Sequence, residues 1–225
     1  PATIRAYKKT KDIGIPVVFG PVNDPVKAGV VSNLRVPAEN ITGIRLTASD
    51  QKRLEWLKML KPELKKVLVP YKKEDVSSNI TVNLVTSAAV EMEIEIIKHP
   101  VANKEDVLKL IDNLLKHIDA IFMPRDGIVM SSIKEFAAVC LERKLILTSP
   151  RQEQIQQGAT TGYGFIGYEL GKQASRIADI ILKGTDPGLI PVETAEDYLF
   201  INKDVANKIG LNISDMILYQ AYGEK

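Results

Sequence analysis

Short apolar runs alternate with amphipathic stretches through the middle of the chain. Apolar and polar residues do not alternate within the runs, as they would in a strand with one solvent-exposed face. The stretches between the runs repeat apolar residues at helical spacing. This order predicts strands covered by helices on both faces, and therefore a parallel sheet. The expected strands are residues 67–69, 93–97, 118–123 and 145–147, and the expected helices are residues 49–60, 77–92, 104–117 and 131–143.

The two ends of the chain carry a second set of elements. Strands are predicted at residues 15–19, 41–46, 159–166 and 193–201, a long helix at 168–182 and a short helix at 203–209. A chain that leaves one lobe and later returns to it forms two lobes joined by crossover strands. We therefore expect an α/β fold with two doubly wound, three-layer α/β/α lobes. Residues 1–46 plus 159–225 would form lobe 1, and residues 47–158 would form lobe 2.

Composition narrows the class of protein. Hydrophobic residues make up 45% and charged residues 26%, as in ordinary soluble globular proteins. The 30 Lys and Arg against 28 Asp and Glu leave a net charge of +2, with no basic run interleaved with aromatics, so no nucleic-acid partner is expected. The single cysteine, Cys140, lies in an apolar helical stretch and is expected to be a small buried hydrophobe rather than a catalytic thiol.

Motifs of enzymes and cofactor sites are missing from the sequence. No Gly-x-Gly-x-x-Gly follows a strand, and no P-loop, Gly-x-Ser-x-Gly or His-Glu-x-x-His occurs. The sequence contains two histidines, His99 and His117, which are few for a metal site or a catalytic triad. We therefore expect no catalysis, no cofactor and no metal. An α/β enzyme is the third interpretation, and it would need a nucleophile–base pair.

Polar side chains follow several predicted strands, at the positions where open α/β sheets bind ligands. A polar residue after a strand is more often a turn former or a helix cap. These loops, however, would all face one cleft, and that favours a binding site. The set comprises Asn23, Asp24, Tyr71, Arg125, Asp126, Ser149 and Arg151, together with Tyr163 inside the glycine-rich strand expected at 159–166.

Several short motifs follow one another in an order typical of one family. They are Ile15-Pro16-Val17-Val18-Phe19, Asn23-Asp24-Pro25-Val26, Asn40-Ile41-Thr42-Gly43, Pro124-Arg125-Asp126 followed by Ser131, Gly162-Tyr163-Gly164 and Ile190-Pro191-Val192-Glu193. On these motifs the chain resembles, over essentially its whole length, the ABC-transporter substrate-binding proteins of the tryptophan/tyrosine-binding type. The resemblance implies a type I periplasmic-binding-protein fold, whose two lobes close on a small ligand without chemistry.

The resemblance also implies a function and roles for residues. The chain would bind an amino-acid-like solute in the periplasm or on a membrane anchor and deliver it to the membrane permease of an ABC importer. No signal peptide opens this chain. The alternative is the ligand-sensing input domain of a signalling protein. Asp126 would neutralise an ammonium group of the ligand. Asn23, Ser149 and the backbone near Thr42 and Gly43 would hold its carboxylate, and Tyr71 and Tyr163 would form the walls of the ligand cleft. Asp24 would lie with Asn23 at the rim of the cleft on lobe 1.

The chain departs from the family pattern in two respects. The family has about two further strand–helix units before the residues that match Pro1, so lobe 1 is expected to be incomplete. Its exposed sheet edge would then pair with a second copy in a homodimer, exchange elements with that copy, or leave the N-terminal 45 residues mobile. Arg125 precedes the family-like Asp126, and Arg45 stands where a small or acidic residue is expected. An added guanidinium favours a ligand with an extra anionic group.

Overall fold

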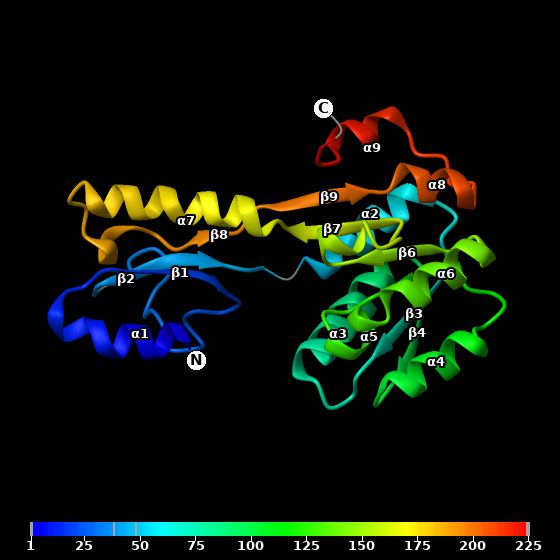
Figure 1. Cartoon of the computed structure of the whole chain (residues 1–225), viewed down its shortest axis with the longest axis horizontal. Helices are drawn as coiled ribbons and strands as arrows, with labels where there is room; N and C mark the ends of the chain where they lie inside the picture. The colour runs from blue at the N-terminus through cyan, green and yellow to red at the C-terminus, as the bar shows by residue number, and fades with distance from the viewer. Residues whose placement is uncertain (1, 38, 48, 224–225) are drawn as a thin grey trace. The chain divides into compact units, whose positions relative to one another are not determined.

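The chain folds into two compact units, seen in a computed structural model that describes residues 2–37, 39–47 and 49–223 (Figure 1). Unit 1 consists of Pro1–Thr47 and Phe165–Glu196, and unit 2 consists of Ala48–Gly164 and Asp197–Lys225. This division differs from the expected lobes, which placed residues 159–225 entirely with the N-terminal segment. The physical reason is that the strands near residues 161 and 199 join the sheet of unit 2.

Unit 2 is built on a six-stranded sheet in the order β4-β3-β5-β6-β7-β9. The strands from β4 to β7 pair in parallel, as their unalternating apolar character predicts. The strands are β3 (Lys66–Tyr71), β4 (Glu95–Pro100), β5 (Ala120–Phe122), β6 (Ile146–Ser149), β7 (Thr161–Phe165) and β9 (Asp197–Ile201). The helices are α2 (Asp50–Leu60), α3 (Val76–Glu91), α4 (Lys104–Asp112), α5 (Gly127–Ser131), α6 (Ile133–Arg143), α8 (Lys203–Ile209) and α9 (Asp215–Gln220), with a 3₁₀ turn η2 at Gln152–Gln154.

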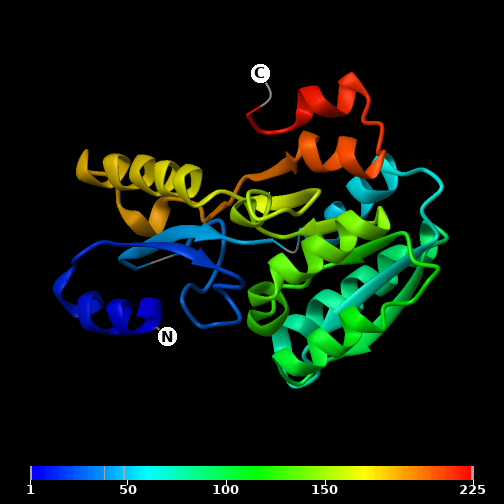
Figure 2. The same ribbon diagram turned by 45° about the vertical axis from the view of Figure 1, so that its right-hand side comes forward.

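Helices cover both faces of the unit-2 sheet, which gives the three layers expected (Figure 2). The alternation within β5 shows this directly. Ala120 and Phe122 pack with α2 and α3, whereas Ile121 and the following Met123 pack with α4 and α6. Because successive side chains of a strand point to opposite faces, both faces must be apolar, and the sequence of β5 accordingly carries no polar residue.

Unit 1 contains a three-stranded parallel sheet in the order β1-β2-β8. The helix α7 (Gly167–Leu182) packs on one face and α1 (Ala2–Thr10) on the other (Figure 1). The strands are β1 (Val17–Val22), β2 (Ile41–Arg45) and β8 (Glu193–Thr194), with 3₁₀ turns η1 at Lys11–Ile13 and η3 at Pro187–Leu189. Gly43 is required in β2, because a Cβ there would overlap the backbone of Phe19 in β1.

The structure differs from the predicted elements in several places. The strand expected at 193–201 is divided into β8 and β9, which belong to different sheets, because the chain passes between the units at Glu196. The helix expected at 104–117 ends at Asp112. Helices α1, α5 and α9 were not predicted. In α1 no residue is buried, so its sequence carries no wide apolar stripe to reveal it.

Two further features bear on the predictions. Cys140 is buried, as expected, and burial raises the pKa of its thiol to about 12, which keeps it protonated and unreactive. Among the described residues, β1 and β8 form the outer strands of the unit-1 sheet. The pairing of such an edge with a second copy stays a prediction.

Candidate ligand-binding site

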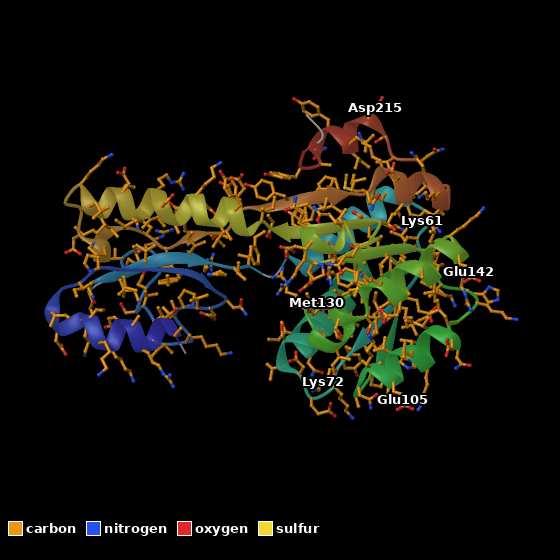
Figure 3. All side chains as sticks on the ribbon, viewed as in Figure 1. Lys61, Lys72, Glu105, Met130, Glu142 and Asp215 are labelled. Atoms are coloured by element: carbon orange, nitrogen blue, oxygen red, sulfur yellow. The ribbon has the colours of Figure 1, made fainter. Side chains whose placement is uncertain are left out.

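One edge of the unit-2 sheet gathers strand ends and helix starts. The parallel strands β3, β5 and β6 end there, and α2, α3 and α5 begin there because each helix runs back across the sheet. In Figure 3, Lys72 and Met130 lie at this edge, and Lys61 and Glu142 lie at the opposite edge. We call it the carboxyl edge of unit 2. The positive ends of helix dipoles make such an edge suited to anions.

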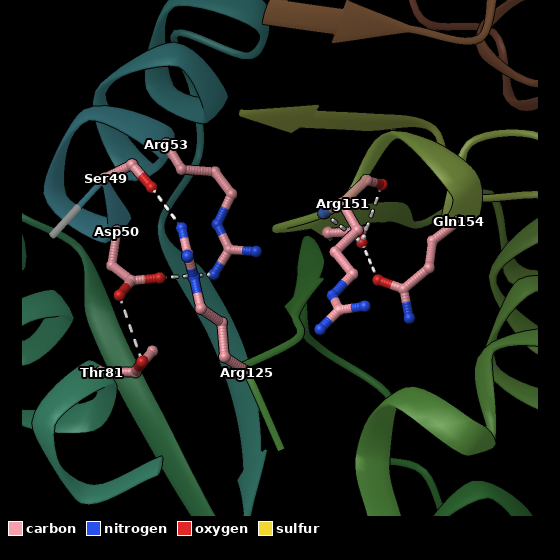
Figure 4. Close-up of polar contacts among 8 residues, drawn as sticks. Ser49, Asp50, Arg53, Thr81, Arg125, Arg151 and Gln154 are labelled. Carbon is pink, nitrogen blue, oxygen red and sulfur yellow. Dashed lines mark hydrogen bonds and ion pairs between the residues drawn. The ribbon is translucent and has the colours of Figure 1, made fainter. Parts of the chain in front are cut away.

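A buried ion pair stands in the first turn of α2. Arg53 Nη2 donates to Asp50 Oδ1 at 2.9 Å, and Thr81 Oγ1 donates to Asp50 Oδ2 at 3.1 Å (Figure 4). The Arg53 and Asp50 side chains are 1% and 7% exposed. Arg53 Cζ lies 3.7 Å from the centroid of the Phe122 ring, a cation–π contact. Burial lowers the pKa of Arg53 to about 9, against the attraction of Asp50 and with added repulsion from Arg125, so Arg53 is charged at neutral pH.

Arg125, which follows β5, lies beside this pair. Its Nη2 donates to Ser49 Oγ at 2.6 Å (Figure 4). Asp197, the first residue of β9, is also within electrostatic reach. Burial raises the pKa of Asp197 to about 6, the attraction of Arg125 opposes this rise, and the repulsion of Asp50 adds to it. Two arginines and two aspartates therefore meet at the carboxyl edge.

The raised pKa of Asp197 leads to a testable pH dependence. Its folded-state pKa lies above the unfolded value of about 3.9, so its ionised form costs stability, and this cost appears as pH rises from about 4 through 6. We expect Asp197→Asn to raise the melting temperature of unit 2 at pH 8 by about 2–4 °C, on the order of 1 kcal/mol after allowing for partial exposure, and to change nothing at pH 4.

Calorimetric melting at both pH values checks this expectation. Glu142→Gln, at an exposed position on α6, is the matched control and should leave the melting temperature unchanged at both. A destabilised Asp197→Asn at pH 8 would mean that attraction to Arg125 outweighs the cost of burial.

The end of β6 contributes a further polar group. Ser149 is buried, and its Oγ donates to Gln154 Oε1 and accepts from Arg151 N at 3.2 Å (Figure 4). Gln154 is buried too, and its Nε2 donates to Met130 O at 3.3 Å. The side chain of Arg151 is exposed and has no ion-pair partner within the described ranges.

Of the unit-2 residues to which the resemblance assigns a ligand contact, the structure brings Tyr71, Asp126 and Ser149 to the carboxyl edge, beside Arg125. Tyr71 is half-buried against the core between the sheet and α2 and α3. Asp126 is buried, and all four of its hydrogen bonds are internal. Tyr163 lies on β7, half-buried in a separate cluster with Trp56, and burial raises the pKa of its hydroxyl. Ligand contacts by these four stay predictions.

The predicted residues of unit 1 fall into two groups. Asn23 and Asp24 are exposed just after β1, and Asp24 Oδ1 accepts from Lys27 N at 3.0 Å, as in a turn. Thr42 and Gly43 lie inside the central strand β2 rather than at its end. Thr42 is fully buried and donates from Oγ1 to Ile190 O at 2.8 Å. Contacts of these residues with a ligand stay predictions as well.

Sequence reasoning missed Ser49, Asp50, Arg53 and Asp197 as site residues. One signal was available. Arg53 stands four residues before Leu57 on the apolar stripe of α2, and a charge on a buried helix face demands a partner. Asp50, three residues earlier, is the partner that this spacing allows. Nothing local marks Asp197, because long-range pairing alone brings β9 to this sheet.

Neither a metal-binding cluster nor a membrane-spanning helix is found in the part of the chain that the structure describes. No group of three or more His, Cys, Asp or Glu side chains has the arrangement to hold a metal ion there. No helix there combines the length and the apolar character needed to cross a membrane.

Comparison with known proteins shows to which protein family the chain belongs. The family model of ABC transporter substrate binding proteins matches residues 1–225. The chain belongs to this family, whose members are extracytoplasmic binding proteins rather than enzymes. The predicted family and the absence of catalysis are thereby confirmed.

Particular relatives sharpen the likeness. The tyrosine-binding protein of Clostridioides difficile is 31% identical over 212 residues, which are 94% of this chain and 61% of that protein. The chain thus spans less than two thirds of the length of this curated relative.

Solved structures confirm the type I periplasmic-binding-protein fold. A ligand-free, open substrate-binding protein with adhesive properties from Clostridium difficile has a TM-score of 0.82 and 27% identity, over 96% of this chain and 72% of that one. A conserved domain protein from Vibrio cholerae has a TM-score of 0.72 and 26% identity, over 92% and 70%. The Streptococcus pneumoniae ABC domain in complex with L-Trp, with a TM-score of 0.73 over 99% and 77%, is 23% identical and supports the fold alone.

Proposed function

We propose that this chain is the solute-binding component of an ABC importer, that it acts outside the cytoplasm, and that it binds a small amino-acid-derived solute. The observation that carries the proposal is the family match over the whole chain. The tyrosine-binding relative supports an amino-acid-derived ligand. Delivery to a membrane permease, and a ligand held in a cleft between the lobes, are parts of the proposal that rest on the family.

Within unit 2, we assign the ligand contacts to the carboxyl edge. Arg125 and the start of α2 offer donors suited to a carboxylate, which every free amino acid carries. The residues to which the resemblance gave a ligand contact remain candidates beside them: Asn23, Asp24, Thr42, Gly43, Tyr71, Asp126, Ser149 and Tyr163. Binding would shift the population of open and closed forms through its differential affinity for the closed form.

The test is a thermal-shift screen of the chain with amino acids, their deaminated counterparts and, as a contrasting class, small sugars. We expect at least one amino-acid-derived compound to raise the melting temperature and to give a saturable signal by calorimetry. A response to sugars alone would overturn the proposal.

A homodimer through unit 1 is a further part of the proposal, and it rests on the resemblance described above. Light scattering should give about twice the mass of one chain. A single-chain mass at high concentration would remove this part and leave the solute-binding role intact.

A further inference from the structure

Three short crossovers connect the two units. The chain passes from one unit to the other after Thr47, after Gly164 and after Glu196. The second crossover falls inside β7 and the third lies directly before β9, so neither contains a long loop. Segments of this kind, a few residues at the ends of strands, are where two domains of one chain turn relative to each other. How firmly the crossovers are held therefore sets how freely the two units move.

One side chain of unit 2, that of Arg125, interacts with the unit-2 end of every crossover. At the first, Arg125 Nη2 donates to Ser49 Oγ at 2.6 Å (Figure 4). At the second, the same nitrogen lies 3.8 Å from the point that a Cβ on Gly164 would occupy. At the third, its positive charge attracts Asp197, whose pKa of about 6 leaves it ionised at neutral pH. Arg125 is thus the common neighbour of three segments that are far apart in the sequence.

The chemistry of this place suits an arginine. A guanidinium carries five N–H donors in a rigid planar fork, so one side chain can join several segments, whereas a lysine offers its charge at a single point. Gly164 is required at its position in β7, because a Cβ there would lie 2.5 Å from Pro150 O. The end of β7 is therefore held close to the loop that follows β6, within reach of Arg125.

The charge of Asp197 indicates a role other than stability. Burial raises its pKa, the repulsion of Asp50 adds to the rise, and the attraction of Arg125 opposes it. If Asp197 served stability alone, a neutral side chain of the same shape would serve better, as the prediction for Asp197→Asn states. Groups that reduce stability are retained mainly where a function needs them. Attraction of Arg125 to the third crossover is such a function.

The unit-1 ends of two crossovers are tied in a similar way. Arg45 Nε donates to Thr194 Oγ1 at 3.2 Å, and Ala195 N donates to Arg45 O at 2.8 Å. Gln173 of α7 binds the same segment, its Nε2 donating to Thr194 O at 3.2 Å. Arg45 and Arg125 are the two arginines at which the chain departs from the family pattern. Both lie at crossovers, which accounts for them without a ligand.

We infer that Arg125 is a positioning residue, which holds the unit-2 ends of the three crossovers together and so narrows the range of arrangements that the two units sample without ligand. The inference goes beyond the proposed function and rests on it only for the consequence. A protein that opens and closes around a ligand binds with an apparent affinity that falls as its binding-competent form becomes rarer. By holding the crossovers, Arg125 keeps that form from being diluted among unproductive arrangements.

Double electron–electron resonance between spin labels tests the inference in the ligand-free protein. One label pair spans the units, at Ser175→Cys on α7 and Glu142→Cys on α6, and the other lies within unit 2, at Ser77→Cys on α3 and Glu142→Cys. All three positions are exposed. Cys140 is buried with a pKa of about 12 and takes no label. We expect Arg125→Gln to roughly double the width of the distance distribution between the units and to leave that within unit 2 unchanged.

Further variants separate the contacts of Arg125. Arg125→Lys keeps the charge without the fork, and Ser49→Ala and Asp197→Asn each remove one contact, so each should broaden the inter-unit distribution less than Arg125→Gln does. The last two are expected to stay folded, because Ser49 makes no side-chain hydrogen bond to α2 and Asp197→Asn is expected to raise stability. Lys134→Gln, which removes an exposed positive charge from α6, is the control and should change neither distribution.

An unchanged inter-unit width in folded Arg125→Gln overturns the inference. Broadening of both label pairs also overturns it, because Arg125 would then support unit 2 itself rather than its crossovers. If Arg125→Gln does not fold, unchanged inter-unit widths in both Ser49→Ala and Asp197→Asn decide against the inference. The measurement uses no ligand, so its result does not depend on any contact between Arg125 and a solute. Failure here leaves the proposed function standing, and a failed solute screen leaves this inference standing.

Discussion

Asp50→Asn is expected to destabilise unit 2 by about 3–5 kcal/mol, the range for breaking a buried ion pair by removing one partner. The reason is the setting of Arg53, whose side chain is 1% exposed and has Asp50 as its ion-pair partner. Asparagine keeps an oxygen for the hydrogen bond but leaves a full positive charge buried beside Arg125, which already disfavours it. Urea unfolding followed by circular dichroism measures the change as a lower midpoint at unchanged slope.

The control for Asp50→Asn lies on the same helix. Glu55 pairs with Lys52 at 2.8 Å, and these side chains are 32% and 51% exposed. Glu55→Gln removes the same charge from an exposed pair and should cost well under about 1 kcal/mol. Equal effects of the two substitutions would show that Arg53 relies on solvent or on another group rather than on Asp50.

The fold was predictable because strands buried on both faces have an unmistakable sequence pattern. β5 is apolar throughout, β3 is apolar at the successive positions 67–69, and the helices between strands carry amphipathic stripes. The path of the chain after residue 159 was not predictable. Nothing in the composition of residues 193–201 shows that β8 and β9 join different sheets, because that choice depends on long-range pairing with β2 and β7.

The candidate site was predictable in position and not in composition. The strand-end rule located the carboxyl edge and the residues Tyr71, Asp126 and Ser149 on it. It could not identify Arg53, which comes from within a helix, or Asp197, which begins a strand. A polar residue after a strand can bind a ligand or cap the next helix. Asp126 shows that burial and hydrogen bonds, rather than sequence position, distinguish these two roles.

Asp126→Asn is expected to destabilise unit 2 by about 2–4 kcal/mol. The carboxylate accepts from Ser78 Oγ at 2.6 Å, Ile128 N at 2.8 Å, Lys72 N at 2.9 Å and Val129 N at 3.1 Å. Asparagine has one accepting oxygen, so its NH₂ group must face backbone donors in a buried site, which is costlier than the loss of a single bond. Urea unfolding measures the change, and a cost below about 0.5 kcal/mol would contradict this account.

The matched control for Asp126→Asn is Asp75→Asn, at the N-cap of α3. Asp75 Oδ1 accepts from Ser78 N at 2.7 Å, an arrangement that asparagine reproduces, so the cost should be a few tenths of a kcal/mol.

The pH dependence gives the Asp126→Asn prediction a second check. Burial by itself would raise the pKa of Asp126, but the hydrogen bonds from Ser78 and from the backbone outweigh burial and lower it. A carboxyl with a lowered folded-state pKa contributes stability above its unfolded pKa of about 3.9 and loses it as pH falls through the folded value. The difference between wild type and Asp126→Asn should therefore be full at pH 7 and shrink below about pH 4. Asp126→Asn also tests the predicted contact of Asp126 with a ligand. If Asp126 is only a helix cap, ligand affinity is unchanged in protein that is still folded. If it contacts a cationic group of the ligand, the binding free energy weakens by about 1.5–3 kcal/mol.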